Sequence, residues 1–211
     1  MSITPALFPE IITAIDTHIA AHADAVTELD QAIGDGDHVF NLQRGIQALQ
    51  AVSSEISLLD WPTAWQKIGM TVMAAIGGAS GSLYATLFIS LHKHSRELGT
   101  DTPAFASAFA QAIEAVKQRG KADIGEKTML DVWVPVAQAL QQDATKAVTL
   151  DDILNHVSEV AHAGVESTRD MLATKGRASF LGERSLGHID AGAQTAALMI
   201  DAIATVLKSH A

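Results

Sequence analysis

The sequence predicts an all-α domain of about eight antiparallel amphipathic helices. Apolar residues recur at steps of three and four through most of the 211 residues, as they do on one face of an α-helix. No segment alternates apolar and polar residues convincingly enough to predict a β-strand. Hydrophobic residues make up 48% of the chain, so residues 1–211 can bury one sizeable core as a single domain.

Each helix is predicted from its own run of apolar residues. The members of a run lie about one turn apart, so they line a single face that packs against the rest of the domain. In chain order the eight runs are Phe8, Ile12, Ile15, Ile19, Ala23 and Val26; Leu42, Ile46 and Leu49; Trp65, Ile68, Val72 and Ile76; Leu83, Leu87 and Leu91; Phe105, Phe109, Ile113 and Val116; Met129, Val132, Val136 and Leu140; Ile153, Val157, Val160, Gly164 and Met171; and Met199, Ile203 and Val206.

The breaks between the predicted helices are of two kinds. Ordinary connectors follow the second, fourth and sixth helices, at 53–62, 99–103 and 143–149. Loops rich in glycine and charged residues follow the first, third, fifth and seventh helices, at 30–38, 77–81, 120–128 and 174–192. In an up-and-down bundle every second connection lies at the same end. We therefore expect the four unusual loops to meet at one rim and to form one site.

Residues 30–38, DQAIGDGDH, hold three carboxylates and an imidazole within nine positions. Like charges at this spacing repel one another unless a cation holds them together. Carboxylates without a nearby thiol favour a hard cation such as Mg²⁺, which commonly shares its ligands with substrate phosphates. The alternative is that the aspartates cap helices and form turns, which suits one or two of them but not all three. The predicted metal ligands are Asp30, Asp35 and Asp37.

The other three loops carry weaker signals. Small residues in GGASG, at 77–81, would let the backbone approach an anion, and Ser80 would cap the next helix; an ordinary glycine-rich helix break is equally compatible. Residues 120–128, GKADIGEKT, approach a P-loop, but Glu126 breaks the pattern and no strand precedes it. Thr128 is predicted to cap the helix that begins at Met129. In the last loop Arg177 suits a phosphate and Asp190 a ribose or amide, although either fits a surface ion pair as well.

Composition narrows the classes of function. A formal net charge of −10 argues against a nucleic-acid partner, because phosphate backbones are bound by basic surfaces. No apolar run approaches the roughly 20 residues that span a bilayer, and no secretory signal is recognisable at the N-terminus. The chain contains no cysteine, which excludes disulfides and thiolate chemistry. A cytoplasmic location without membrane association is therefore expected.

Four motifs together resemble one family. LDQAIGDGDH, GGASG, RGKADIGEKTMLDVW and KGRASFLGERSLGHIDAG are similar, in order and approximate spacing, to the nucleotide-binding L subunits of bacterial dihydroxyacetone kinases (DhaL). The resemblance implies an eight-helix antiparallel barrel with ADP or ATP bound across one rim. It also implies that Asp30, Asp35 and Asp37 hold two Mg²⁺ ions that bridge the nucleotide phosphates. The nucleotide site would be lined by His38, Asn41, Ala79, Ser80, Gly120, Met129, Arg177, Asp190 and Gly192.

The chain departs from the family pattern at two positions. Val39 replaces a usual glycine after the histidine, and Ala191 replaces a usual proline before Gly192. Neither change removes a predicted metal ligand.

The resemblance further implies a role within a phosphotransferase-system kinase of separate subunits. There a K-type subunit holds dihydroxyacetone covalently on a histidine, and the L subunit donates the terminal phosphoryl group of its ATP. A phosphohistidine of an M-type subunit then recharges the resident ADP. Because the nucleophile belongs to a partner, no catalytic residue is assigned in this chain. Two other roles stay open: a kinase subunit that exchanges free ATP and serves another small ketose, and a nucleotide-sensing module without catalysis.

Overall fold

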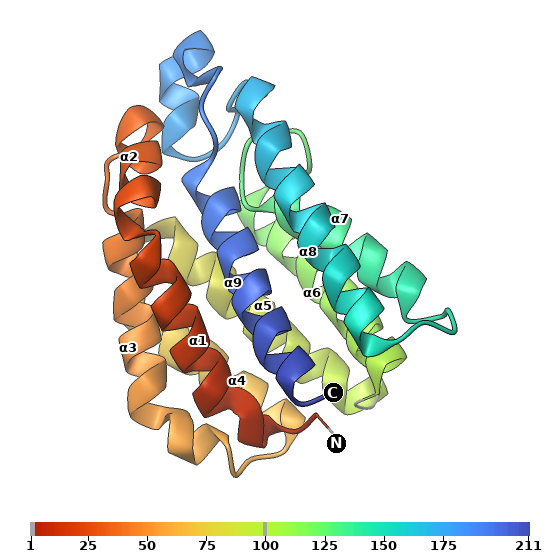
Figure 1. Ribbon diagram of the computed structural model, residues 1–211. Coiled ribbons are helices and arrows are strands. Elements are labelled where there is room, and N and C mark those ends of the chain that lie inside the picture. The colour runs from red at the N-terminus through yellow and green to blue at the C-terminus, as the bar shows by residue number, and fades with distance from the viewer. Residues whose placement is uncertain (1–2, 99–100) are drawn as a thin grey trace.

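The computed structural model describes residues 3–98 and 101–211, and this part of the chain is helical without any strand (Figure 1). The all-α prediction is thereby confirmed. The α-helices are α1 (Phe8–Ala21), α2 (Ala23–Ile33), α3 (His38–Ile56), α4 (Trp61–Ala75), α5 (Gly78–Leu98), α6 (Thr102–Gly120), α7 (Leu130–Asp143), α8 (Leu150–Ser167) and α9 (Ala191–Ser209). Three 3₁₀ helices accompany them: η1 (Pro5–Leu7), η2 (Thr168–Asp170) and η3 (Arg177–Ser185).

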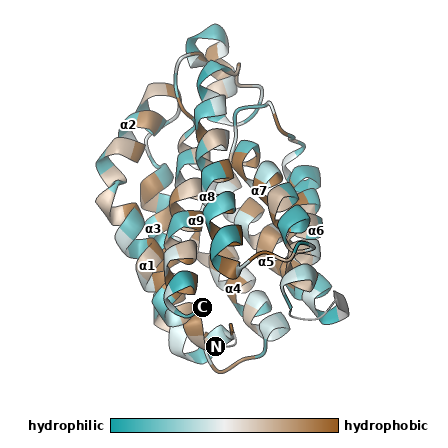
Figure 2. Cartoon of the chain, turned by 45° about the vertical axis from the view of Figure 1, so that its right-hand side comes forward, coloured by the Kyte–Doolittle hydropathy of each residue, from teal (hydrophilic) through white to brown (hydrophobic). Residues whose placement is uncertain are grey.

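The helices close into a barrel. Going round the ring, α3, α4, α5, α6, α7, α8 and α9 each pack against the next, and α1 lies between α9 and α3. In Figure 1 the dark blue α9 lies beside the red α1, so the two ends of the ring meet. Figure 2 shows that the helices carry both apolar and polar residues, and the buried apolar residues of these helices pack together in one core. No described helix is long and apolar enough to cross a bilayer.

Eight of the described α-helices form the ring. The ninth, α2, continues α1 past its end and is not a separate member of the ring. The sequence predicted one helix through residues 8–26, and this is wrong at His22, whose φ of −113° and ψ of 9° interrupt the helix. Ile19, on one side of the break, and Val26, on the other, are both buried. Apolar spacing continues across the interruption, so periodicity alone did not show it.

Several connections are shorter than predicted. The helices on either side of the 53–62 connector extend into it and leave only residues 57–60 between them. The 77–81 loop nearly disappears, because α5 already begins at Gly78. Gly99 and Thr100 of the predicted 99–103 connector lie outside the described residues.

The close contact of α7 with α8 depends on Gly164. A Cβ atom at this position would lie 2.5 Å from the Asp131 carbonyl oxygen and 3.0 Å from the Val132 Cα atom. Both are backbone atoms, which cannot rotate out of the way, so even one added methyl group would force the two helices apart.

Gly164→Ala is expected to lower the free energy of unfolding by about 1–3 kcal/mol, as overpacking of a core usually does. Urea denaturation measures the loss. The sign is informative, because glycine to alanine within a helix is otherwise stabilising by up to about 1 kcal/mol. The neighbouring Ala163 is exposed in the same helix. Ala163→Gly therefore calibrates the intrinsic helix preference, and a stabilised Gly164→Ala variant would contradict the clash.

Candidate functional site

The four unusual loops meet at one end of the barrel, as their alternation predicted. Asp35 of the first loop forms a 2.7 Å ion pair with Arg177 of the last. Glu126 of the third loop accepts a 2.9 Å hydrogen bond from the Thr174 hydroxyl, and the His38 ring lies 2.9 Å from the Thr195 hydroxyl on α9. A Cβ atom added at Gly77, in the second loop, would lie 3.7 Å from the Asn41 amide oxygen. Residues far apart in the sequence thus surround one rim.

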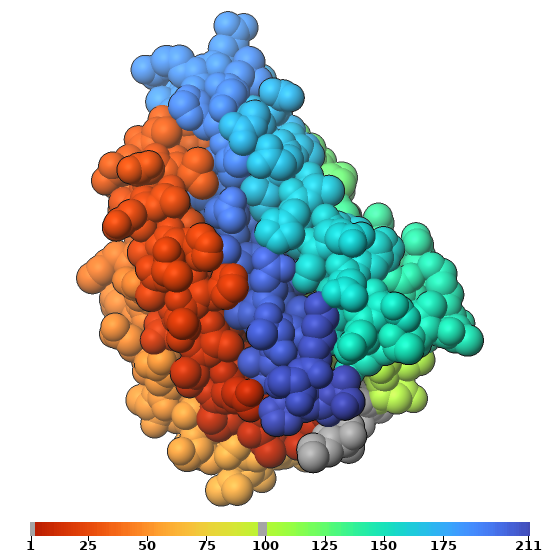
Figure 3. Space-filling model, in the orientation of Figure 1, coloured from red at the N-terminus to blue at the C-terminus, as the bar shows by residue number. Residues whose placement is uncertain are grey.

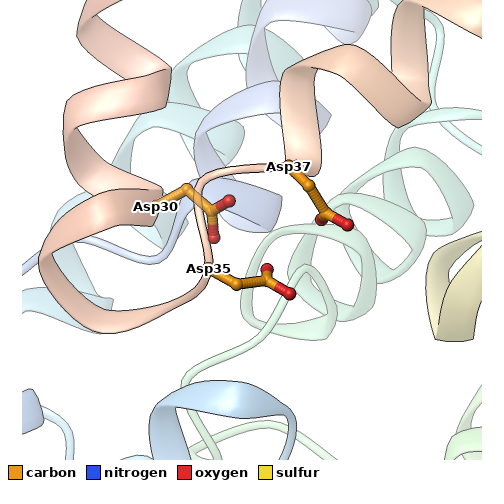
Figure 4. A group of neighbouring side chains, drawn as sticks. All are labelled: Asp30, Asp35 and Asp37. Carbon is orange, nitrogen blue, oxygen red and sulfur yellow. The ribbon is translucent and has the colours of Figure 1, made fainter.

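The three aspartates form a compact cluster at this rim. One carboxylate oxygen from each of Asp30, Asp35 and Asp37 lies within 4.8 Å of the other two (Figure 4). The donors are all carboxylate oxygens, half-buried at Asp30 and exposed at the other two residues, which suits a hard divalent cation. The residues therefore fit Mg²⁺, and their assignment as its ligands stays a prediction.

Two glycines shape the loop that carries the cluster. A Cβ atom at Gly34 would lie 2.2 Å from Asp30 Oδ1, so any larger residue would displace that carboxylate. Gly36 has a φ of +76°, in the region that favours glycine. Asp30 Oδ2 accepts a 3.1 Å hydrogen bond from the His38 backbone N–H, which ties the end of α2 to the start of α3. The sequence GDGD is thus needed to turn the chain while keeping three carboxylates together.

Hydrogen bonding orients the imidazole of His38. The Thr195 hydroxyl donates to the Gly192 carbonyl oxygen at 3.1 Å, so its oxygen is left to accept from His38 Nε2 at 2.9 Å. This places the proton of the neutral ring on Nε2 and leaves Nδ1 with a lone pair. Burial lowers the pKa of His38, although Asp30 and Asp37 oppose that shift. The neutral ring is therefore favoured.

Two buried charged residues that sequence reasoning did not assign lie at the third loop: Lys127 within it and Asp131 in the first turn of α7. Asp131 accepts hydrogen bonds from the backbone N–H groups of Gly125 at 2.5 Å and Thr128 at 2.7 Å. The Lys127 ammonium donates to the carbonyl oxygens of Thr168 at 2.5 Å and of His188. The Asp131 bonds hold the third loop against the start of α7, and the Lys127 bonds fasten that loop to η2 and to the last loop. The spacing T-x-x-D at 128–131 resembles a capping box and was the available signal for Asp131.

The two predicted helix caps have different outcomes. The Thr128 hydroxyl accepts a 3.1 Å hydrogen bond from the backbone N–H of Leu130, the first residue of α7. The helix therefore begins one residue later than predicted, and Met129 rather than Thr128 occupies the N-cap position. The prediction for Ser80 is wrong, because Ser80 lies within the first turn of α5 rather than before it. Because α5 begins directly after Gly77, most of the glycine-rich segment 77–81 is helical.

Asp190 caps the N-terminus of α9 at the rim. Its carboxylate accepts a 2.7 Å hydrogen bond from the Ala193 backbone N–H, and a Cβ atom at Gly192 would lie 3.0 Å from its Oδ2. The same added atom would lie 3.7 Å from the backbone nitrogen of Met129, so Gly192 lets the start of α9 approach α7. Burial raises the pKa of Asp190 to about 7, with Asp131 and Asp30 adding to the shift and Lys127 opposing it.

This pKa predicts how Asp190 affects stability in metal-free and nucleotide-free protein. Between its ordinary value of 3.8 and about 7, the folded state retains a proton that the unfolded state releases. The stabilisation of the folded state by this bound proton is therefore fully present below the ordinary pKa of 3.8, and it is lost as the pH rises to about 7. Asp190→Asn keeps a capping side chain without titrating. Urea denaturation at several pH values should show the wild type losing stability relative to Asp190→Asn across this window; a constant difference would contradict the shift.

Ala79, Ser80 and Gly120 also lie near this end, although no hydrogen bond or ion pair within the described residues joins them to the carboxylates. Ala79 and Ser80 are in the first turn of α5, and Gly120 is the last residue of α6, where an added Cβ would lie 3.3 Å from Leu83.

The two departures from the family pattern are accommodated. Val39 is buried in the first turn of α3, and Ala191 is the first residue of α9, a position where proline is favourable but not required.

The sequence signature of the DAK2 domain matches residues 32–205, which include every predicted site residue except Asp30. The chain belongs to the DAK2 domain family. This DAK2 domain is 40% identical over 178 residues to the ADP-binding subunit DhaL of PEP-dependent dihydroxyacetone kinase 1 from Listeria innocua, covering 84% of each chain. It is 34% identical over 209 residues to the corresponding subunit from Escherichia coli K12, covering 99% of this chain and 100% of that protein. The DAK2 domain is thus DhaL-like.

A solved structure has the same fold. The dihydroxyacetone kinase from C. freundii, crystallised in complex with AMP-PNP and Mg²⁺, matches this DAK2 domain with a TM-score of 0.73 at 23% sequence identity. The match covers 95% of this chain but only 34% of the C. freundii chain, so the DAK2 fold is one part of that longer kinase.

Proposed function

We propose that this DAK2 domain is the ADP-binding subunit of a PEP-dependent dihydroxyacetone kinase. The observation that carries the proposal is the carboxylate cluster of Asp30, Asp35 and Asp37 at the rim of a DhaL-like chain. The Listeria and Escherichia relatives, named as ADP-binding subunits of such kinases, support it over most of their length. In this role the chain is a phosphotransferase component that acts only with partner subunits.

The aspartate cluster would hold two Mg²⁺ ions against the phosphates of ADP or ATP. Bound there, Mg²⁺ neutralises negative charge on the phosphoryl group as it moves. Arg177, whose side chain is 71% exposed, is free to exchange its carboxylate partner Asp35 for a phosphate oxygen. The neutral His38 adds no charge at the cluster. The nucleotide would lie against His38, Asn41, Ala79, Ser80, Gly120, Met129, Arg177, Asp190 and Gly192.

The proposed relay needs two partners. A K-type subunit holds dihydroxyacetone, whose hydroxyl oxygen would form a bond to the γ-phosphorus of ATP. The bond from that phosphorus to the ADP oxygen would break, and the hydroxyl proton would pass to a base of the K-type subunit. A phosphohistidine of an M-type subunit then transfers its phosphoryl group to the β-phosphate of ADP, and the phosphorus–nitrogen bond breaks. The chain itself contributes position and charge rather than a nucleophile.

The nucleotide content of the purified protein tests this scheme first. Protein kept in Mg²⁺ is dialysed for a long period and denatured, and the released nucleotide is quantified by ion-exchange chromatography. About one ADP per chain supports a resident coenzyme and the relay. A freely exchanging site that turns over ATP with the K-type subunit alone would favour an ATP-exchanging kinase instead. Tight Mg-nucleotide binding without transfer to any K-type subunit would indicate a nucleotide sensor.

A further inference from the structure

Thr195 alone is polar among the buried residues of α9, a helix that the structure describes in full; the others are alanine, leucine and valine. Figure 3 shows the outer face of α9, in dark blue, between the red α1 and the cyan α8. Thr195 is 0% exposed and so lies on the inner face of this helix. Burying a hydroxyl costs free energy unless it is hydrogen-bonded, and alanine is the better helix former. The hydroxyl therefore indicates a role other than packing.

The Thr195 hydroxyl joins the start of α9 to the start of α3. It donates to the Gly192 carbonyl oxygen at 3.1 Å, a bond within its own helix. Its oxygen also lies 2.9 Å from Nε2 of His38, a residue 157 positions earlier in the sequence. The bond to Gly192 is of the local kind that threonine makes in many helices. The contact with His38 is a long-range one, and it holds one edge of the imidazole ring.

The two ring nitrogens of His38 have different surroundings. Nε2 faces the buried Thr195 hydroxyl, whereas Nδ1 makes no hydrogen bond within the described residues. The ring is only half-buried and Nδ1 is not enclosed, so a ligand at the rim can reach it. With the ring proton on Nε2, Nδ1 has a lone pair and can only accept a hydrogen bond. A deprotonated phosphate oxygen has no proton to donate, so Nδ1 requires a different group of the ligand.

We infer that Thr195 is a positioning residue, which keeps the proton of His38 on Nε2 so that Nδ1 accepts a hydrogen bond from the bound Mg-nucleotide. The inference rests on the proposed function, in which His38 lines the nucleotide site. Thr195 does not bind the nucleotide itself, because its side chain is fully buried. The donor to Nδ1 is an O–H or N–H group, which belongs either to the ribose or adenine or to a water that accompanies Mg²⁺.

Nuclear magnetic resonance of the nucleotide-free protein tests the tautomer directly. Long-range proton–nitrogen correlation spectra distinguish a protonated ring nitrogen from an unprotonated one, and the His38 signals are those that disappear in His38→Asn. At a pH well above 6.5, the ordinary pKa of histidine, the wild type should show a protonated Nε2 and an unprotonated Nδ1. In Thr195→Val the two nitrogen shifts should approach each other, because a ring that is not held exchanges between tautomers. Thr195→Ser keeps the hydroxyl and should restore the wild-type spectrum.

Calorimetry with Mg-ADP tests whether the fixed ring matters to the ligand. Loss of one hydrogen bond should raise the Kd of Thr195→Val about fivefold, while Thr195→Ser should stay within about twofold of the wild type. In a His38→Asn background, Thr195→Val should have no further effect, because Thr195 acts through His38. Thr205→Val is the matched control. It removes an exposed hydroxyl of the same helix, which donates only to the Asp201 carbonyl oxygen at 2.8 Å, and should change neither the spectrum nor the Kd.

Magnesium pyrophosphate distinguishes the two sources of the donor, because it has phosphates and Mg²⁺ with its waters but no ribose or adenine. If Thr195→Val weakens the binding of Mg-ADP and leaves that of Mg-pyrophosphate unchanged, Nδ1 accepts from the nucleoside. If the binding of both is weakened to the same extent, Nδ1 accepts from a water that accompanies Mg²⁺. Either result supports the inference, because in both Thr195 acts through an accepting Nδ1.

A protonated Nδ1 in the wild type would overturn the inference, and this spectrum does not require any variant to fold. The inference would also be overturned if Thr195→Val kept the wild-type tautomer, bound Mg-ADP as tightly as the wild type, or lost further affinity in the His38→Asn background. Failure of the proposed function looks different. The wild type would then show the fixed tautomer and an affinity for Mg-ADP that depends on Thr195, yet no phosphoryl group would reach dihydroxyacetone when K-type and M-type subunits were added.

Discussion

Asp37→Asn is expected to reduce phosphoryl transfer to dihydroxyacetone by at least about a hundredfold while the helices stay folded. Coordination of a divalent cation contributes several kcal/mol to the stabilisation of a transferring phosphoryl group, and each 1.36 kcal/mol corresponds to a factor of ten. Asp37 is the cleanest of the three aspartates to change. The Asp30 carboxylate accepts a hydrogen bond from the His38 N–H and Asp35 pairs with Arg177, whereas the Asp37 carboxylate makes no hydrogen bond or ion pair within the described residues.

Stability measurements separate loss of metal from loss of fold in this variant. Asp37→Asn removes one of three like charges whose oxygens lie within 4.8 Å, so in EDTA the variant should melt no lower than the wild type. Added Mg²⁺ with ADP should raise the wild-type melting temperature and should raise that of the variant far less. Asp24→Asn, an exposed aspartate on α2 outside the cluster, is the matched control. Full transfer activity in Asp37→Asn, with unchanged Mg²⁺ dependence, would refute the metal assignment.

Much of this architecture follows from local patterns in the sequence. Apolar residues spaced three and four positions apart predict a helix that buries one face, and every helix of the barrel buries one face in the core. The alternation of ordinary and unusual breaks then predicts which loops share an end. The acidic cluster was also predictable, because Asp30, Asp35 and Asp37 lie within eight residues and a tight glycine turn cannot separate them.

Other features depend on contacts that no local pattern contains. The break at His22 leaves the apolar spacing intact, so nothing in the periodicity marks it. The burial of Lys127 was not predictable from the sequence, because lysine is almost always exposed. Its burial depends on carbonyl groups about 40 and 60 residues later in the chain. Phe180 is the opposite case, an aromatic residue that is exposed. Its exposure follows only from the packing of its neighbour Leu181 against a small cluster of Ile33, Ala173 and Ala178.

Lys127→Met is expected to destabilise the protein strongly and to loosen the rim. The Lys127 side chain is only 1% exposed, and its ammonium group donates to carbonyl oxygens of Thr168, Arg169 and His188. Methionine fills a similar volume but donates nothing, so buried carbonyl groups lose their partner at a cost of about 1–3 kcal/mol each. A total loss of about 3 kcal/mol would lower the melting temperature of a chain of this length by about 6–12 °C.

The effect should reach the nucleotide as well, because Lys127 joins the third loop to the segment that leads into Asp190 and α9. We therefore expect calorimetry to show weaker binding of Mg-ADP to Lys127→Met, even at temperatures where circular dichroism shows the variant fully folded. Lys121→Met is the matched control: this lysine lies on the same loop and is exposed, and its φ of 50° is positive like the φ of 61° at Lys127. It should change the melting temperature by little. If Lys127→Met melted within about 2 °C of the wild type and bound ADP equally well, the buried ammonium would not be what holds the two loops together.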